Sequence, residues 1–261
     1  MTNTIEERLD FSSYLSVDAI SSTGLRLLRR SPAHFKARVQ EDPTRAQELG
    51  TLVHMLILEP DRFRQSVAVG PDVSRATKTW KEFEAGAEGR TLLKRQDYDQ
   101  ISAMADSVMA NKAARTLIEK GLKEVSFFWE DADTKMKCKA RPDLISMGSL
   151  ADIKTTSNAH PLAFPRQVAN LGYWIQAAFY MMGHLAVYDF PAEEFFFVAV
   201  ENYAPYVCGV YRASSEMISR GKDEVARLLG IYEDCERSGE WPGYGSNYNY
   251  TITIDLPRWA E

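Results

Sequence analysis

The sequence has few cysteines and no long apolar run. Its three cysteines, Cys138, Cys208 and Cys235, are far apart and form no CxxC pair, so a disulfide scaffold, a zinc knuckle and an iron–sulfur cluster are not expected. No apolar segment approaches the roughly 20 residues that a membrane-spanning helix needs. The first ten residues are polar and acidic, unlike a signal peptide. These absences favour a cytoplasmic protein with no membrane partner.

Signature motifs of nucleotide-binding proteins and serine hydrolases are also missing. The sequence contains no GxGxxG, no GxxxxGKS/T and no GxSxG, so no motif supports nucleotide binding or a serine hydrolase. Acidic residues (36) outnumber basic ones (31), which gives a net charge of −5. This balance argues against a protein that coats DNA but not against one that cuts it, because a cutting enzyme needs an acidic metal pocket.

The residues that are present are those of a folded globular protein, with 45% hydrophobic, 26% charged and 11% aromatic in a chain of 261. Hydrophobic periodicity predicts two helices within residues 16–40, separated at Ser31-Pro32. The serine should cap the second helix and the proline should occupy its first position. Further elements are expected before residue 120: helices over 47–58, 78–87 and 96–119, and a loop over 66–75.

The second half of the sequence changes to a β-rich pattern. Strands are expected over residues 124–130, 135–146, 149–155, 193–200 and 206–211, and helices over 165–185 and 214–238. Together these elements predict one α/β domain, in which helices flank a mixed central sheet. It would consist of a mainly helical part (1–120), an α/β core (121–240) and an irregular tail (241–261).

Two aspartates and a lysine lie on neighbouring predicted strands, in the segments Pro142-Asp143 and Asp152-Ile153-Lys154. A tight turn between the strands would bring Asp143 beside Asp152. Alternate residues of a strand share a face, so Asp152 and Lys154 should point the same way while Ile153 points into the core. Two carboxylates and an ammonium group would then converge on one pocket.

Such a pocket suits phosphodiester hydrolysis. Carboxylates are hard oxygen ligands of the kind that Mg²⁺ prefers, and a bound cation can polarise a phosphoryl group and activate a water. A lysine can orient or deprotonate that water, or offset charge in the transition state. A surface ion pair is the alternative interpretation of an isolated Asp-x-Lys; the preceding Pro-Asp favours catalysis.

Pro142-Asp143 followed by Asp152-Ile153-Lys154 resembles the defining motif of the PD-(D/E)xK nucleases. Further similarities point to the RecE (exonuclease VIII) and RecB-like branch of that superfamily, and they cover most of the chain. The segment from Gly50 to His54 is similar to a Gly-x-x-x-His helix whose histidine binds metal. Gln176 and Tyr180 resemble a Gln-x-x-x-Tyr motif, and Glu124 resembles an additional glutamate beside the metal.

Each outlying element also has a structural interpretation that the residues alone leave open. His54 would otherwise be a packing residue on a half-apolar helix, and imidazole suits Mn²⁺ better than Mg²⁺. Gln176 and Tyr180 share a face of any helix because they are four residues apart. Glu124 could be a solvent-facing strand end.

The resemblance implies a restriction-endonuclease-like core and a set of roles for these residues. Asp143, Asp152, His54 and the Ile153 carbonyl, with Glu124 as an additional ligand, would bind Mg²⁺, with Mn²⁺ as a substitute and no iron–sulfur cluster. Lys154 would act on the attacking water, and Gln176 and Tyr180 would position the strand. The implied substrate is the end of linear double-stranded DNA, digested from its 5′ end by a ring-shaped homo-oligomer of phage origin. The 3′ tails would pass to a RecT-like annealing partner.

Basic residues provide further candidates for contact with DNA: Arg26, Arg30, Lys78 and Arg141. Those in the first predicted helices could equally form a solvated helix surface. Two other functions stay open at the level of the sequence: a non-catalytic DNA-binding phage accessory protein that keeps the fold, and a structure-specific endonuclease with the same metal site.

Overall fold

The computed structural model describes residues 3–7, 9–38, 42–146, 148–244, 251 and 253–256. Its central sheet has the strand order β10-β9-β8-β7-β4. These strands are β4 (Leu122–Lys123), β7 (Leu144–Ser146), β8 (Ser149–Thr156), β9 (Glu194–Glu201) and β10 (Cys208–Arg212). β8 and β9 run parallel and the other neighbours antiparallel, so the sheet is mixed, as predicted.

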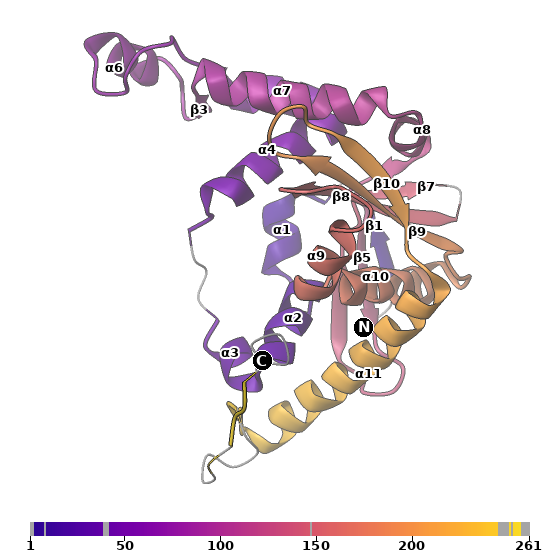
Figure 1. Ribbon diagram of the computed structural model, residues 1–261. Helices are drawn as coiled ribbons and strands as arrows, with labels where there is room; N and C mark the ends of the chain where they lie inside the picture. Colours follow the sequence, from indigo (N-terminus) through magenta and orange to yellow (C-terminus); the bar gives the residue numbers. More distant parts are fainter. Residues whose placement is uncertain are drawn as a thin grey trace.

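Helices cover both faces of this sheet (Figure 1). Those on one face are α4 (Arg45–Leu58), α5 (Pro60–Ser66), α7 (Arg95–Ala110) and α8 (Lys112–Lys120). Those on the other are α2 (Ser22–Arg30), α3 (Pro32–Lys36), α9 (Phe164–Asn170), α10 (Tyr173–Tyr188) and α11 (Ser215–Ser238). The alternation of a strand divides the core between these layers: on β8, Leu150 packs with the second set, while Ala151 and Ile153 pack with the first. The predicted α/β architecture is confirmed.

A second, antiparallel sheet of β1 (Thr4–Glu6), β5 (Ser126–Glu130) and β6 (Lys137–Ala140) packs against α10. The single strand predicted over residues 135–146 is therefore wrong. It divides into β6 and β7, which belong to different sheets. The division falls at Arg141-Pro142-Asp143, where proline cannot donate a ladder hydrogen bond and the chain turns a corner.

Three other predictions need correction. The helix predicted over 96–119 breaks at Asn111, whose Oδ1 accepts hydrogen bonds from the backbone N–H groups of Ala113 and Ala114 and so starts α8. The helix predicted over 165–185 breaks at Gly172, whose φ of 68° lies in the left-handed region. In the predicted loop over 66–75, β2 (Val67–Val69) pairs with β3 (Thr91–Leu93).

Local capping follows the sequence elsewhere. Ser31 caps α3 by accepting a hydrogen bond from the N–H of His34, with Pro32 in the first turn. Two helices extend the frame: α1 (Phe11–Ser16), which the sequence did not indicate, and α6 (Lys78–Ala85), which projects from the body (Figure 1). Residues 39–40 of the second predicted helix, and much of the predicted tail 241–261, lie outside the described residues. None of the helices in the described part has the length and apolarity to span a bilayer.

Candidate active site

The β7–β8 pair brings the two aspartates together. Leu144 lies opposite Ala151 in the antiparallel register, so Asp143, just before β7, comes next to Asp152. One oxygen of Asp143, Oδ2, accepts a hydrogen bond of 2.6 Å from the backbone N–H of Ile153. The carboxylate thus accepts the hydrogen bond that a backbone carbonyl would accept if the β7–β8 pairing continued, and this bond holds the side chain at the end of the strand pair.

Asp152 and Lys154 share the face of β8 that points to α10, as the alternation predicts. The Nζ of Lys154 forms an ion pair with Oδ2 of Asp152 and donates a hydrogen bond of 2.9 Å to Oε1 of Gln176. The amide Nε2 of Gln176 donates to Asp152 Oδ1 and to the hydroxyl of Tyr180, both at 2.9 Å. The two α10 residues therefore belong to one network with the strand residues.

α4 supplies His54 from the opposite layer. Its Nδ1 lies 3.4 Å from Oδ2 of Asp143. Gly50, one turn earlier, lets the helix approach β8 closely, because a Cβ at this position would lie 3.2 Å from Oγ1 of Thr155. The Gly-x-x-x-His spacing thus has a local reason: the glycine admits the helix and the histidine one turn later reaches the carboxylate.

The charges in the site are strongly coupled. Burial raises the pKa of Asp152 to about 6, and the nearby charge of Asp143 adds to this effect. Burial also acts to raise the pKa of Asp143, but the His54 charge and hydrogen bond outweigh it and hold that pKa below its ordinary value. Burial acts to lower the pKa of His54, but the charge and hydrogen bond of Asp143, together with the charge of Asp152, outweigh it, so the histidine pKa is raised. Of the two carboxylates, Asp152 is therefore the one whose ionised form the site stabilises less.

The donor atoms at this place fit a hard divalent cation. Oδ2 of Asp152 is buried and accepts no hydrogen bond, although the Lys154 ammonium lies beside it. A cation at the two carboxylates would offset the repulsion between Asp143 and Asp152. Across the described residues, no three His, Cys, Asp or Glu side chains are gathered into a ligand cluster. Two carboxylates and the Ile153 carbonyl, with water, suit Mg²⁺, which keeps several waters.

Glu124 lines the same cleft as Asp143 and His54. Its carboxylate pairs with Nη2 of Arg141 at 3.0 Å, and its backbone N–H donates to the carbonyl of Asp143 at 3.0 Å. Arg141 Nη1 also donates to the carbonyl of Leu9 at 2.8 Å and to the Ser126 hydroxyl at 3.2 Å. The contacts of Glu124 and Arg141 thus stabilise the corner between β6 and β7, from which the Asp143 side chain reaches the site. Metal binding by Glu124 and DNA contact by Arg141 stay predictions.

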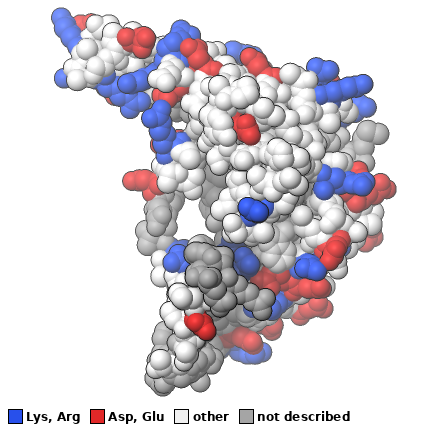
Figure 2. Space-filling view, viewed as in Figure 1, with Lys and Arg blue, Asp and Glu red and all other residues white. Residues whose placement is uncertain are grey.

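A cleft of about 1200 Å³ opens in front of these residues, between α4 and the α1–α2 segment. Figure 2 shows the molecule hollowed there. Arg26 and Arg141 line it, whereas Arg30 donates to the Tyr244 hydroxyl and Lys78 pairs with Glu82 at 3.6 Å on α6. The structure thus brings two of the four predicted DNA contacts to the cleft and leaves the other two outside it.

Two residues that the sequence did not single out also lie at the site or in the cleft. The ammonium of Lys154 lies 4.4 Å from the centroid of the Tyr173 ring. Lys139, only 6% exposed, lines the cleft and donates to the carbonyls of Tyr14, Leu15 and Val17 at the end of α1. Tyr173 lies three residues before Gln176, one turn away, and that spacing was the available signal. No local pattern marks Lys139.

Residues 21–253 match the family described as "PDDEXK-like domain of unknown function (DUF3799)". The chain is also similar to the crystal structure of a "Putative exonuclease" from Eubacterium rectale, with a TM-score of 0.62, 14% identity and 96% of each chain covered. That likeness shows a shared fold.

Two further similarities are too weak to support a conclusion. An alkaline exonuclease (LHK-Exo) from Laribacter hongkongensis has a TM-score of 0.28 and 15% identity, over 67% of this chain and 94% of that one. The structure SSO0001 has a TM-score of 0.29 and 16% identity, over 78% and 86%. The sequence matches no curated protein.

Proposed function

Because the chain belongs to the family of PDDEXK-like domains of unknown function (DUF3799), we propose that it is a divalent-metal-dependent nuclease that hydrolyses phosphodiester bonds of DNA. The observation that carries this proposal is the buried carboxylate of Asp152, which is only 3% exposed and whose pKa is raised to about 6. It lies next to the Lys154 ammonium and near the second carboxylate, Asp143. These groups together match the needs of a charged phosphate under attack by water.

Each side chain has a task in this proposal. Asp143, Asp152 and the Ile153 carbonyl would hold Mg²⁺, with His54 as a further ligand, and the ion would polarise the phosphoryl group and lower the pKa of a bound water. Lys154 would orient the water or offset charge developing on the phosphate.

Two residues of α10 would position these groups. Gln176 fixes the direction of the Lys154 ammonium and one oxygen of Asp152. Tyr180 holds the Gln176 amide through its hydroxyl. Such outer hydrogen bonds orient the groups that act on substrate, and Tyr180 also lines the cleft.

We propose further that the substrate is the end of linear double-stranded DNA, digested 5′→3′ in the manner of RecE. Mg²⁺ would be the metal, with Mn²⁺ as a substitute. The 3′ single-stranded products would serve recombination through a RecT-like annealing protein, and a ring-shaped homo-oligomer would keep the enzyme on its substrate. The support for these finer statements is the similarity of the motifs around His54, Asp143, Asp152 and Gln176 to the RecE branch.

The test is a cleavage assay of the wild type beside Asp152→Asn and Lys154→Ala, on linear duplex and on covalently closed circular DNA in Mg²⁺. Each variant should lose at least about a hundredfold in rate, which is the scale of one charge-stabilising group. Asp106→Asn, a carboxylate removal on the exposed side of α7, is the matched control and should cleave like the wild type. Retained activity in both site variants would place the active site elsewhere. Cleavage of the closed circle would contradict the exonuclease proposal and favour the endonuclease.

A further inference from the structure

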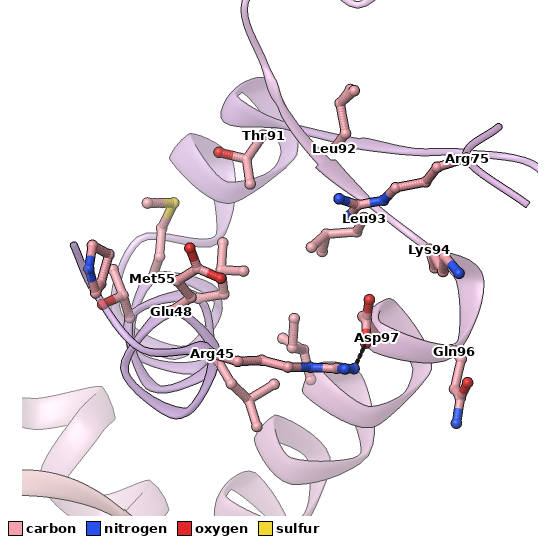
Figure 3. Close-up of a pocket in the computed structure, with 15 residues that line it drawn as sticks. Arg45, Glu48, Met55, Arg75, Thr91, Leu92, Leu93, Lys94, Gln96 and Asp97 are labelled. Carbon is pink, nitrogen blue, oxygen red and sulfur yellow. Dashed lines mark hydrogen bonds and ion pairs between the residues drawn. The ribbon is translucent and has the colours of Figure 1, made fainter. Parts of the chain in front are cut away.

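A second hollow, of about 870 Å³, lies on the other side of α4 from the catalytic site. We call it the α4–α7 groove; α4, β3 and the start of α7 form its walls (Figure 3). Its floor is aliphatic, with Leu52, Leu93 and Ile101 buried beneath it. A hollow of this size and lining is typical of a ligand-binding pocket.

The groove adjoins the catalytic cleft along one edge of α4. Thr51 and Met55 line both hollows. Thr51 is exposed and Met55 is half-buried, and Met55 directly follows His54, which contacts Asp143. A flexible chain that leaves the two catalytic carboxylates can therefore cross this edge of α4 and enter the groove.

Charged side chains of both signs lie around the aliphatic floor, with Glu48 and Asp97 beside Arg45, Arg75 and Lys94. Arg45 and Asp97 form an ion pair of 2.7 Å, and Figure 3 shows this pair on one side, with Arg75 and Lys94 on another. In the part of the chain that the structure describes, Arg75 and Lys94 have no acidic partner, and Arg75 lies over the ring of Trp80. These two cations remain available to an anionic ligand.

The surroundings of the groove carry charges of both signs. Figure 2 shows Lys and Arg side chains gathered at the end of the molecule that carries α6 and the start of α7. The basic residues of this segment are Arg75, Lys78, Lys81, Arg90, Lys94 and Arg95. Residues 72–99 also hold six acidic side chains, Asp72, Glu82, Glu84, Glu88, Asp97 and Asp99. The segment is therefore neutral overall, and attraction of an anion to the groove depends on the placement of Arg75 and Lys94 at its wall.

We propose that the α4–α7 groove is a second DNA subsite, which holds unpaired nucleotides of the strand that passes through the catalytic cleft. This inference rests on the proposed nuclease function. Base faces would make apolar contact with the aliphatic floor, and Arg75 and Lys94 would contact phosphates. A peptide segment could cover an apolar floor as well, but the free cations and the shared edge with the catalytic cleft favour a nucleic-acid strand.

The first test measures binding of a short labelled single strand in EDTA over a range of salt concentrations. Each phosphate neutralised on a single strand contributes about 0.7 to the slope of log K against log salt, so removing two contacts should lower that slope by about 1.4. Arg75→Ala/Lys94→Ala should show this loss. Lys112→Ala/Lys120→Ala, the same charge change on exposed positions of α8, should bind with the wild-type slope.

A second variant guards against a local folding defect at Trp80. Thr91→Glu keeps both cations and places a carboxylate on the exposed wall of the groove. It should weaken single-strand binding several-fold at an unchanged Tm.

The groove proposal is overturned if both groove variants bind like the wild type, if the α8 pair loses as much slope, or if the wild type binds no single strand. Its failure differs from that of the proposed function. A wild type that cleaves DNA while the groove variants bind normally refutes the groove alone. A wild type that cleaves no DNA in Mg²⁺ or Mn²⁺ refutes the nuclease.

Discussion

Gln176 joins the charged groups of the site, so its removal should damage stability and activity together. The side chain is 7% exposed. It accepts a hydrogen bond from Lys154 and donates to Asp152 and Tyr180, each at 2.9 Å. The substitution Gln176→Met keeps nearly the same length and volume, so it removes these hydrogen bonds without opening a large cavity.

The magnitude follows from the kind of bonds lost. Two of the three involve a charged partner, and hydrogen bonds to charged groups contribute about 1.5–3 kcal/mol each. Oδ1 of Asp152 would also lose its Gln176 partner inside the protein, next to an Oδ2 that already accepts no hydrogen bond. Since the ion pair with Lys154 remains, we expect the free energy of unfolding to fall by about 2–4 kcal/mol.

Cleavage should fall as well, because Lys154 and Asp152 would no longer be held in one orientation. Outer hydrogen-bond partners of metal ligands are typically worth about 10–100-fold in metal affinity or activity. The assay combines urea unfolding with cleavage of linear DNA over a Mg²⁺ titration, in conditions where the variant is still folded. The expected result is a rate reduced about 10–100-fold that excess Mg²⁺ does not fully restore.

Gln65→Met is the matched control, since Gln65 is exposed on α5. It should unfold and cleave like the wild type. Gln176→Met could instead unfold at the wild-type urea concentration and cleave at the wild-type rate. The hydrogen bonds of Gln176 would then contribute neither to the free energy of unfolding nor to the orientation of Asp152 and Lys154.

Three more predictions follow from packing and charge. On α11, Gly221→Ala should lower the free energy of unfolding by about 1–3 kcal/mol, because a Cβ there would lie 2.6 Å from the Cβ of Ala178 on α10. Gly230→Ala, with nothing within 4 Å, should raise it by about 0.5–1 kcal/mol; equal effects in urea unfolding would refute the close packing of these helices. Tyr173→Phe should keep most of the cleavage rate and Tyr173→Leu should lose about tenfold, since only an aromatic face attracts the Lys154 ammonium; equal rates would exclude that role. EDTA should abolish cleavage without unfolding the protein, and saturating Mg²⁺ at about 100 times its Kd should restore it and add about 2.7 kcal/mol of stability; cleavage that persists after metal removal would contradict the proposed metal dependence.

Local geometry was readable from the sequence because it depends on the backbone alone. The alternation of a strand places Asp152 and Lys154 on one face and Ile153 in the core. The spacing of a helix places Gln176 and Tyr180 together. The mixed α/β architecture followed from the order of elements, and the cap at Ser31 from its chemistry.

Contacts between distant segments were decided only by the tertiary structure. Periodicity put His54 on a helix, but the packing of α4 on β8, through Gly50, brings it to Asp143. The corner at Pro142 sends β6 and β7 into different sheets. The same corner lets Glu124 pair with Arg141. Such pairings depend on which faces of remote elements are buried together, and the free energy of that burial is not contained in any local stretch of residues.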